Sequence, residues 1–193
     1  MTTKQTLYLA LVVTFIVTFA IPLLQRAGLA PTIIVGGSMI GGAIGWYFTS
    51  LKRPTNPRKL VPVYLLTAAL LYLHIWEEYL YEFGPRIGVL TGTGWTESEF
   101  MVQIAFYLPA FWILGAIGLY YSHPLGNFVA WFVFFGMFLG EPTHLLIFPN
   151  LEGGRYHYFP GMWTALLPMV MGIWGIYIII KDYNKAKLAG DIS

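Results

Sequence analysis

Apolar residues form six long runs along the chain, separated by short polar segments. Each run has about the 20 residues that a helix needs to cross a hydrocarbon core of roughly 30 Å. The runs cover residues 7–24, 32–51, 60–81, 100–121, 128–148 and 160–180. The pattern predicts an all-α, polytopic membrane protein: a helical bundle of six transmembrane helices in one domain, residues 1–193.

The segments between the runs predict loops. Residues 52–59 are basic and contain two prolines, which excludes a buried helix there. Residues 82–99 combine glycine, proline and acidic residues, and we expect an outer loop with a short surface helix and solvated acids. Pro109 predicts a kink inside the fourth run.

Composition supports the membrane assignment and removes several kinds of chemistry. The chain is 57% hydrophobic and only 10% charged, whereas soluble domains carry about 25% charged residues. It has no cysteine, which excludes disulfides, thiolate metal ligands and iron–sulfur clusters. The net charge is +2, and no basic patch is interleaved with aromatic residues, so nothing indicates a nucleic-acid partner.

Basic residues predict the orientation of the bundle. With the N-terminus inside, the inner segments hold eight Lys and Arg residues and the outer segments hold three. The inner set is Lys4, Lys52, Arg53, Arg58, Lys59, Lys181, Lys185 and Lys187, and the outer set is Arg26, Arg86 and Arg155. Because cytoplasmic loops carry the excess of basic residues, both termini are predicted to be cytoplasmic.

The third run carries ionisable residues that a membrane helix rarely tolerates. His74 lies three and four residues before Glu77 and Glu78, so it shares a helix face with both. A carboxylate at the bilayer centre costs about 2.5–3.5 kcal/mol on insertion scales. These side chains must therefore be paired, protonated, bound to a cation or in contact with water.

Two other segments bring the same residue types to a similar depth. Glu141 and His144, on either side of Pro142, lie three residues apart near the outer end of the fifth run. His157 immediately precedes the sixth run, which begins on the outer side. Six spans with this orientation therefore place three His- and Glu-bearing elements near the outer leaflet.

Imidazole and carboxylate together form the ligand set of zinc, non-haem iron or manganese. Helix bundles hold such metals through Glu-x-x-His pairs and single Glu residues from neighbouring helices. The metal ligands are predicted to be His74, Glu77, Glu141, His144 and His157, with Glu78 as the catalytic carboxylate. The competing interpretation is a set of structural His–Glu hydrogen bonds between helices. His123, in a turn, is expected to be structural, and Glu152 to pair with Arg155.

Residues 74–79, His-Ile-Trp-Glu-Glu-Tyr, resemble the signature of the HXXEE-motif family. Residues 158–165, Tyr-Phe-Pro-Gly-Met-Trp-Thr-Ala, are similar to the second recurrent segment of that family. The resemblance implies a small bacterial polytopic protein of the cytoplasmic membrane with a suspected enzymatic activity. It implies no particular substrate or cofactor.

Three functions are compatible with these features. The first is a metal-dependent membrane enzyme, a hydrolase or an oxidoreductase, acting on a lipophilic substrate through the outer His/Glu site. The second is a metal-free acid–base enzyme such as a lipid isomerase. The third is a non-catalytic subunit of a larger membrane complex, which would form homo- or hetero-oligomers through the glycine-rich second span.

Overall fold

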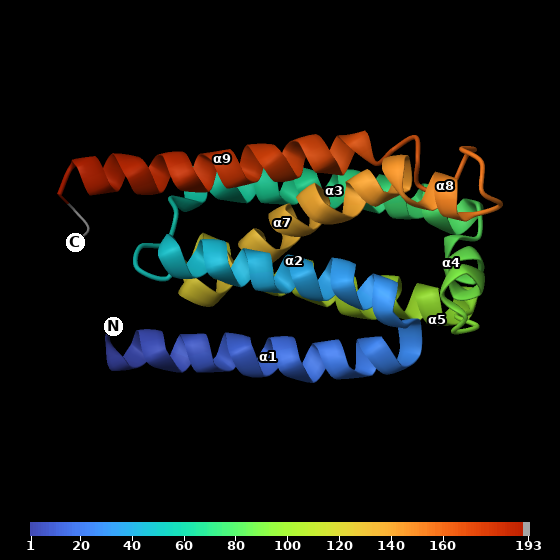
Figure 1. Ribbon diagram of the computed structural model, residues 1–193. Coiled ribbons are helices and arrows are strands. Elements are labelled where there is room, and N and C mark those ends of the chain that lie inside the picture. The colour runs from blue at the N-terminus through green and yellow to red at the C-terminus, as the bar shows by residue number, and fades with distance from the viewer. Residues whose placement is uncertain (191–193) are drawn as a thin grey trace.

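The computed structural model describes residues 1–190 and confirms the all-α prediction. Within these residues there is no strand, and six helical segments are long and apolar enough to cross a membrane. Figure 1 shows them side by side in a bundle, with the N-terminus and the end of the last helix at the same end. We call the half of the bundle near the termini the terminal half and the opposite half the distal half.

The first three spans are α1 (Thr3–Ala27), α2 (Leu29–Phe48) and α3 (Pro57–Leu80), and the short α4 (Phe83–Thr91) follows them. The fourth span consists of α5 (Glu97–Val102), a π-helical segment η1 (Gln103–Tyr107) and α6 (Leu108–Tyr120). The fifth is α7 (Pro124–Leu146) with the short α8 (Phe148–Leu151), and the sixth is α9 (Leu166–Leu188). The predicted surface helix in the outer loop is thus α4.

A kink is predicted at Pro109, and the structure has an irregular helical segment just before this residue. Pro109 stands in the first turn of α6, directly after the wide turns of η1. A proline nitrogen cannot donate to the carbonyl one turn back, and π-helical turns are a recognised way for a helix to accommodate a local break. The fourth span is therefore widened at residues 103–107 instead of simply bent at the proline.

The helix starts follow from capping side chains. Asn56 precedes α3 and accepts a hydrogen bond from the Arg58 amide at 3.0 Å. His123 precedes α7, and its Nδ1 accepts from the Leu125 amide at 3.2 Å. Each cap satisfies an amide that has no partner within its helix. The structural role predicted for His123 is confirmed.

The predicted start of the sixth span is wrong. Residues 160–180 were expected to be helical, but α9 begins at Leu166. Gly161 has a φ of +84°, which is a left-handed conformation that interrupts a helix. The amides of Trp163 and Thr164 consequently have no helical carbonyl as partner, and they donate to Glu77.

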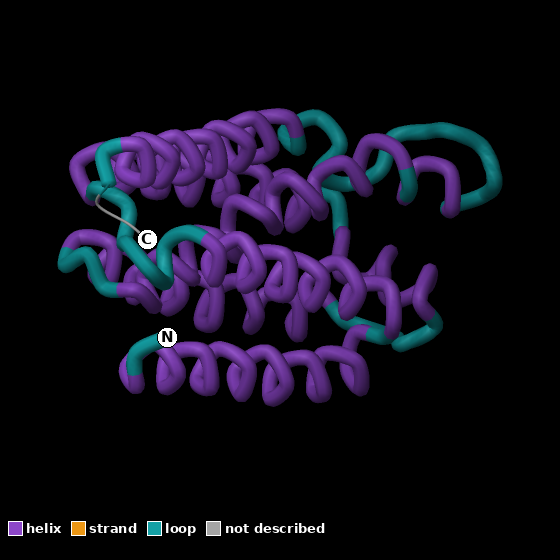
Figure 2. Tube along the Cα trace, turned by 60° about the vertical axis from the view of Figure 1, so that its left-hand side comes forward, coloured by secondary structure: helices purple, strands orange, loops and turns teal. Residues whose placement is uncertain are grey.

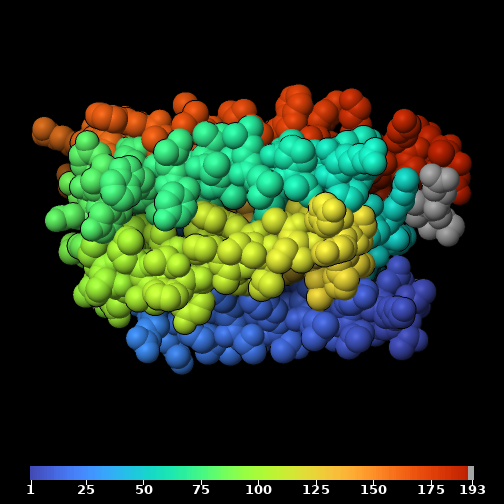
Figure 3. All heavy atoms as spheres, turned by 180° about the vertical axis from the view of Figure 1, so that it is seen from behind, coloured from blue at the N-terminus to red at the C-terminus, as the bar shows by residue number. Residues whose placement is uncertain are grey.

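Helix α7 is the centre of the bundle. It packs against α2, α9 and α6, and α3 packs against α9 and α6. Helix α1 contacts chiefly α2, and Figures 1 and 2 both show it at one edge. Seen from behind in Figure 3, α9, α3, the fourth span and α1 lie next to one another across that face. The large apolar side chains exposed on α1 are suited to lipid contact.

The terminal half contains the main apolar core. Trp46, Tyr64, Leu119 and Phe134 are completely buried there. Polar groups in this core are paired: for example, the Trp46 indole donates to the Pro124 carbonyl at 2.7 Å. Such pairing removes the cost of burying a polar atom.

Candidate metal centre

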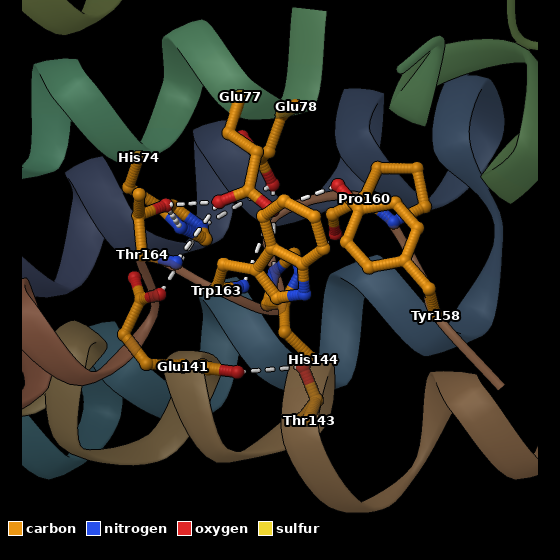
Figure 4. Close-up of polar contacts among 11 residues, drawn as sticks. His74, Glu77, Glu78, Glu141, Thr143, His144, Tyr158, Pro160, Trp163 and Thr164 are labelled. Atoms are coloured by element: carbon orange, nitrogen blue, oxygen red, sulfur yellow. Dashed lines mark hydrogen bonds and ion pairs between the residues drawn. The ribbon is translucent and has the colours of Figure 1, made fainter. Parts of the chain in front are cut away.

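Helices α3 and α7 and the irregular segment before α9 meet in the distal half (Figure 4). His74, Glu77 and Glu78 come from α3, and Glu141 and His144 come from α7. All five side chains are buried. Because α7 continues through Pro142, Glu141 and His144 do share one side of the helix, as the spacing predicts.

Four of these residues form a compact group that we call the His–Glu cluster: His74, Glu78, Glu141 and His144. His74 Nε2 lies 3.1 Å from Glu141 Oε2 and 3.6 Å from Glu78 Oε1. His144 Nε2 lies 3.4 Å from the same Glu78 oxygen. One ligand atom from each of His74, Glu78 and His144 falls within 4.8 Å of the others, so these three residues could hold a metal ion.

The hydrogen bond that His144 makes through Nδ1 determines whether Nε2 carries a hydrogen. His144 Nδ1 lies 2.8 Å from the Pro160 carbonyl oxygen. A carbonyl only accepts hydrogen bonds, so Nδ1 must carry the hydrogen. In the neutral ring Nε2 then has a free lone pair, and it is directed at Glu78.

The tautomer of His74 is determined in the same way, through Thr164 and Glu77. The Thr164 hydroxyl donates to Glu77 Oε2 at 2.6 Å. With its hydrogen used there, Thr164 Oγ1 accepts from His74 Nδ1, which lies 3.1 Å away. The Nε2 lone pair of a neutral His74 is therefore also free, so both histidines present an acceptor atom to the carboxylates of the cluster.

Glu77 faces the segment before α9 and not the centre of the cluster. Its Oε1 accepts from the Tyr158 hydroxyl at 2.7 Å and the Trp163 amide at 3.2 Å. Its Oε2 accepts from the Thr164 amide at 2.9 Å as well as from the Thr164 hydroxyl. Burial and the adjacent Glu77 carboxylate raise the pKa of Tyr158, so the phenol keeps the hydrogen that it donates. The interrupted sixth span thus supplies the partners of Glu77.

Gly161 allows that segment to pass directly over the two imidazole rings. A Cβ at this position would lie 2.6 Å from His144 Nδ1 and 2.6 Å from His74 Cε1. Its φ of +84° is also unfavourable for any other residue. Local contacts therefore explain the Pro-Gly pair at 160–161. Pro160 supplies a carbonyl to His144, and Gly161 leaves space for both imidazole rings.

The charges of the cluster are not balanced by basic side chains. In the described part of the chain, the ion-pair contacts of Glu78 and Glu141 are to histidines alone. Glu141 Oε2 is buried and makes no hydrogen bond, although His74 Nε2 is near it. Two carboxylates facing two imidazole lone pairs in a buried site require positive charge, which a divalent cation or protons can supply.

His157 is not brought to the cluster. It is exposed in the loop after α8, where Nε2 donates to Glu152 at 2.8 Å and Nδ1 donates to the Arg155 carbonyl at 2.7 Å. These two hydrogen bonds raise the pKa of His157, the one to the Arg155 carbonyl most strongly. Glu152 contacts Arg86 at 3.2 Å in addition to His157, instead of forming the pair expected with the Arg155 side chain.

Sequence reasoning also missed some polar groups. Glu97 was expected to be a solvated loop acid, but both of its carboxylate oxygens are buried and have no hydrogen-bond partner. Pro160 and Thr164 were not recognised as partners of the two histidines. The only available signal was the segment at 158–165, whose residue types gave no indication of their contacts.

Comparison of the chain with protein-family models, curated proteins and solved structures finds no match.

Proposed function

We propose that the protein is an integral-membrane, metal-dependent enzyme, a hydrolase or an oxidoreductase, that acts on a lipophilic substrate. His74, Glu78 and His144 are the metal ligands in this proposal. Two histidines and one carboxylate form the ligand set of many catalytic zinc sites and of non-haem iron oxygenases. Such a set leaves positions open for water or substrate.

The spacing of the nitrogen and oxygen atoms carries the proposal. Ligands bound at about 2.0–2.1 Å to one tetrahedral metal lie roughly 3.3–3.4 Å apart. The two His–Glu78 separations are 3.6 and 3.4 Å. Both Nδ1 atoms are already occupied by the Thr164 hydroxyl and the Pro160 carbonyl. The lone pairs that remain are the ones that a metal ion would use.

The roles differ from those expected from the sequence. Glu78 becomes a ligand, and Glu77 becomes a positioning residue that orients His74 through Thr164. Partners of this kind fix the tautomer and the orientation of ligating histidines. The sequence-based assignment of Glu77 and His157 as ligands has no geometric support, because Glu77 accepts its hydrogen bonds from residues 158–164 and His157 lies in the exposed loop.

A divalent ion supplies Lewis acidity for hydrolysis or, if it is iron, redox chemistry. Glu141 is the remaining carboxylate beside the ligand set, and its Oε2 has no hydrogen bond. We assign Glu141 the task of accepting a proton from a water molecule at the centre. The surrounding apolar side chains exclude bulk water and strengthen these interactions.

The resemblance to the HXXEE-motif family remains a prediction, and it is consistent with this proposal. The two segments that carry the resemblance meet in the site: Thr164 contacts both His74 and Glu77. Each segment thus has a task in one centre, which gives a physical reason for their occurrence in the same chain.

Elemental analysis of the purified protein tests the proposal. The wild type, reconstituted in lipid nanodiscs and incubated with zinc, iron or manganese, should retain one of these metals in stoichiometric amount after desalting. A His74→Ala/His144→Ala variant should lose it. His157→Ala is the matched control, because this histidine lies outside the cluster and its loss should leave the metal content unchanged.

Two results would contradict the proposal. One is a folded wild-type protein that retains none of the three metals. The other is a double variant that retains as much metal as the wild type. The first would favour protons as the balancing charge and the acid–base interpretation of the cluster.

A further inference from the structure

A cavity of about 280 Å³ adjoins the His–Glu cluster. His74, Glu78, Glu141 and His144 form part of its wall, and the rest comes from α2, α3, α4, the fourth span and α7. Along α7 it extends from Phe132 to His144, which corresponds to about 18 Å of helix. The cavity is therefore elongated and lies within the depth of the bundle.

The cavity lies in the distal half, beside a looser part of the contact between α2 and α7. In the terminal half the glycines of α2 touch α7: a Cβ at Gly42 would lie 2.8 Å from the Phe132 backbone. Farther along α7, a Cβ at Gly136 would lie 3.7 Å from Ser38, and one at Gly140 would lie 3.5 Å from Ile34. Glycines at 136 and 140, one turn apart, thus leave space that larger side chains would fill.

The lining away from the cluster is suited to an apolar molecule. Its hydroxyl groups are already used: Ser38 donates to the Ile34 carbonyl and Thr143 donates to the Gly140 carbonyl. An apolar cavity with few free polar partners does not hold water well. A hydrocarbon chain that enters from the bilayer would be favoured there over solvent.

One polar atom in the lining has no partner. The Trp112 Nε1 is buried and makes no hydrogen bond. Its ring packs against Tyr72 at 6.0 Å between centroids, and Tyr72 precedes His74 by two residues, or about 3 Å of helix rise. An indole N–H is only a donor. A ligand that satisfies it must present an oxygen or nitrogen acceptor to the Trp112 side of the cavity.

We propose that this cavity is the substrate pocket, and that it binds a single-chain lipid whose oxygen-bearing head accepts a hydrogen bond from Trp112. The head lies between Trp112 and the His–Glu cluster, both of which line the cavity, and the chain lies along Gly136 and Gly140. The volume is close to the lower end of the roughly 300–1,000 Å³ of small-molecule pockets, which fits one chain better than a fused ring system. The identification of this molecule as the substrate rests on the proposed function, whereas its binding does not.

Photolabelling in phosphatidylcholine nanodiscs tests the pocket. The probe is a decanol with a diazirine in its chain, and labelled peptides are identified by mass spectrometry. In the wild type, label should be found on peptides that contain residues 132–144, and unlabelled decanol should compete about tenfold better than decane. Gly136→Leu, which fills the cavity, should reduce this labelling at least tenfold.

Trp112→Phe keeps an aromatic ring and removes the N–H donor. It should weaken competition by decanol about tenfold, to the level of decane, because one hydrogen bond of typical strength is lost. Trp174→Phe is the matched control, since Trp174 is 54% exposed on the outside of α9. Its labelling and competition should equal those of the wild type.

Metal content measured on the same samples separates this proposal from the previous one. Unchanged metal together with labelling that Gly136→Leu does not reduce would overturn the pocket assignment. Equal competition by decanol and decane in the wild type would overturn the assignment of Trp112. A wild type without metal that still shows the expected labelling would contradict the proposed enzyme and support the lipid pocket.

Discussion

The same two helices, α2 and α7, pack in opposite ways in the two halves of the bundle. In the terminal half, Gly41 and Gly45 of α2 pack against the rings of Phe135 and Trp131. In the distal half a Cβ at Gly136 or Gly140 would lie only at ordinary contact distance from α2, and both glycines line the cavity that adjoins the His–Glu cluster. The contact between α2 and α7 is therefore tighter in the terminal half than in the distal half.

Polar side chains differ between the halves in the same manner. In the terminal half, Asn127 Oδ1 accepts from the Thr55 amide at 3.0 Å, and the Trp131 indole donates to Thr49 at 3.1 Å. In the distal half, lone pairs of His74 and His144 face carboxylates. Complementary pairing stabilises a fold, whereas facing acceptors leave a requirement for a cation. The comparison separates structural polarity from polarity that serves a ligand.

The largest expected effect tests the packing difference. Gly42→Ala should lower the free energy of unfolding by about 1–3 kcal/mol, because the added Cβ meets the α7 backbone and cannot be accommodated by a side-chain movement. Gly136→Ala should change it by no more than about 1 kcal/mol, and in the stabilising direction, because alanine favours helix and the added Cβ would lie 3.7 Å from Ser38, an ordinary contact distance. Unfolding of each variant in mixed detergent micelles, followed by circular dichroism, provides the measurement. Equal destabilisation by both substitutions would contradict the proposed difference between the halves.

A second experiment addresses the support of the cluster. Glu77→Gln should lower metal affinity about 10- to 100-fold, because an amide cannot accept all the hydrogen bonds that orient Thr164 and His74. Competition with a chelator at increasing concentration measures the loss. Glu152→Gln is the control, because this carboxylate lies in the loop after α8, away from the cluster, and should leave metal affinity unchanged. Unaltered affinity in Glu77→Gln would show that Glu77 does not position the ligands.

The smallest expected effect lies in the exposed loop after α8. The raised pKa of His157 means that its contacts with Glu152 and the Arg155 carbonyl favour the protonated ring. They should be fully formed below about pH 6.5, the value of an unperturbed histidine, and weaken as pH rises through the higher pKa of the folded loop. Limited proteolysis at Gly153 and Gly154 should therefore become a few-fold faster between pH 6 and pH 8. His157→Gln should remove this pH dependence without changing metal content, and a profile identical to that of the wild type would exclude His157 as its source.

Much of the architecture could be predicted from local sequence. Uninterrupted hydrophobicity of about 20 residues has one low-energy solution in a bilayer, so the six spans were predictable. Most boundaries were close to those observed, but the sixth span was predicted to begin six residues too early, at 160 instead of Leu166. Apolar composition alone does not reveal that Gly161 takes a left-handed conformation and that the following amides bind a carboxylate.

The sequence by itself determined the spans, the grouping of basic residues at one end, and the presence of His and Glu at one depth. Tertiary structure alone decided which of these residues meet. Glu77 and Glu78 are adjacent and therefore point about 100° apart around α3, so packing turns one toward residues 158–164 and the other toward α7. His157 shares the chemistry of the other histidines, yet an exposed loop keeps it out of the cluster. Hydropathy is a local property of the chain, whereas a ligand set depends on the relative rotation and separation of helices, which long-range packing fixes.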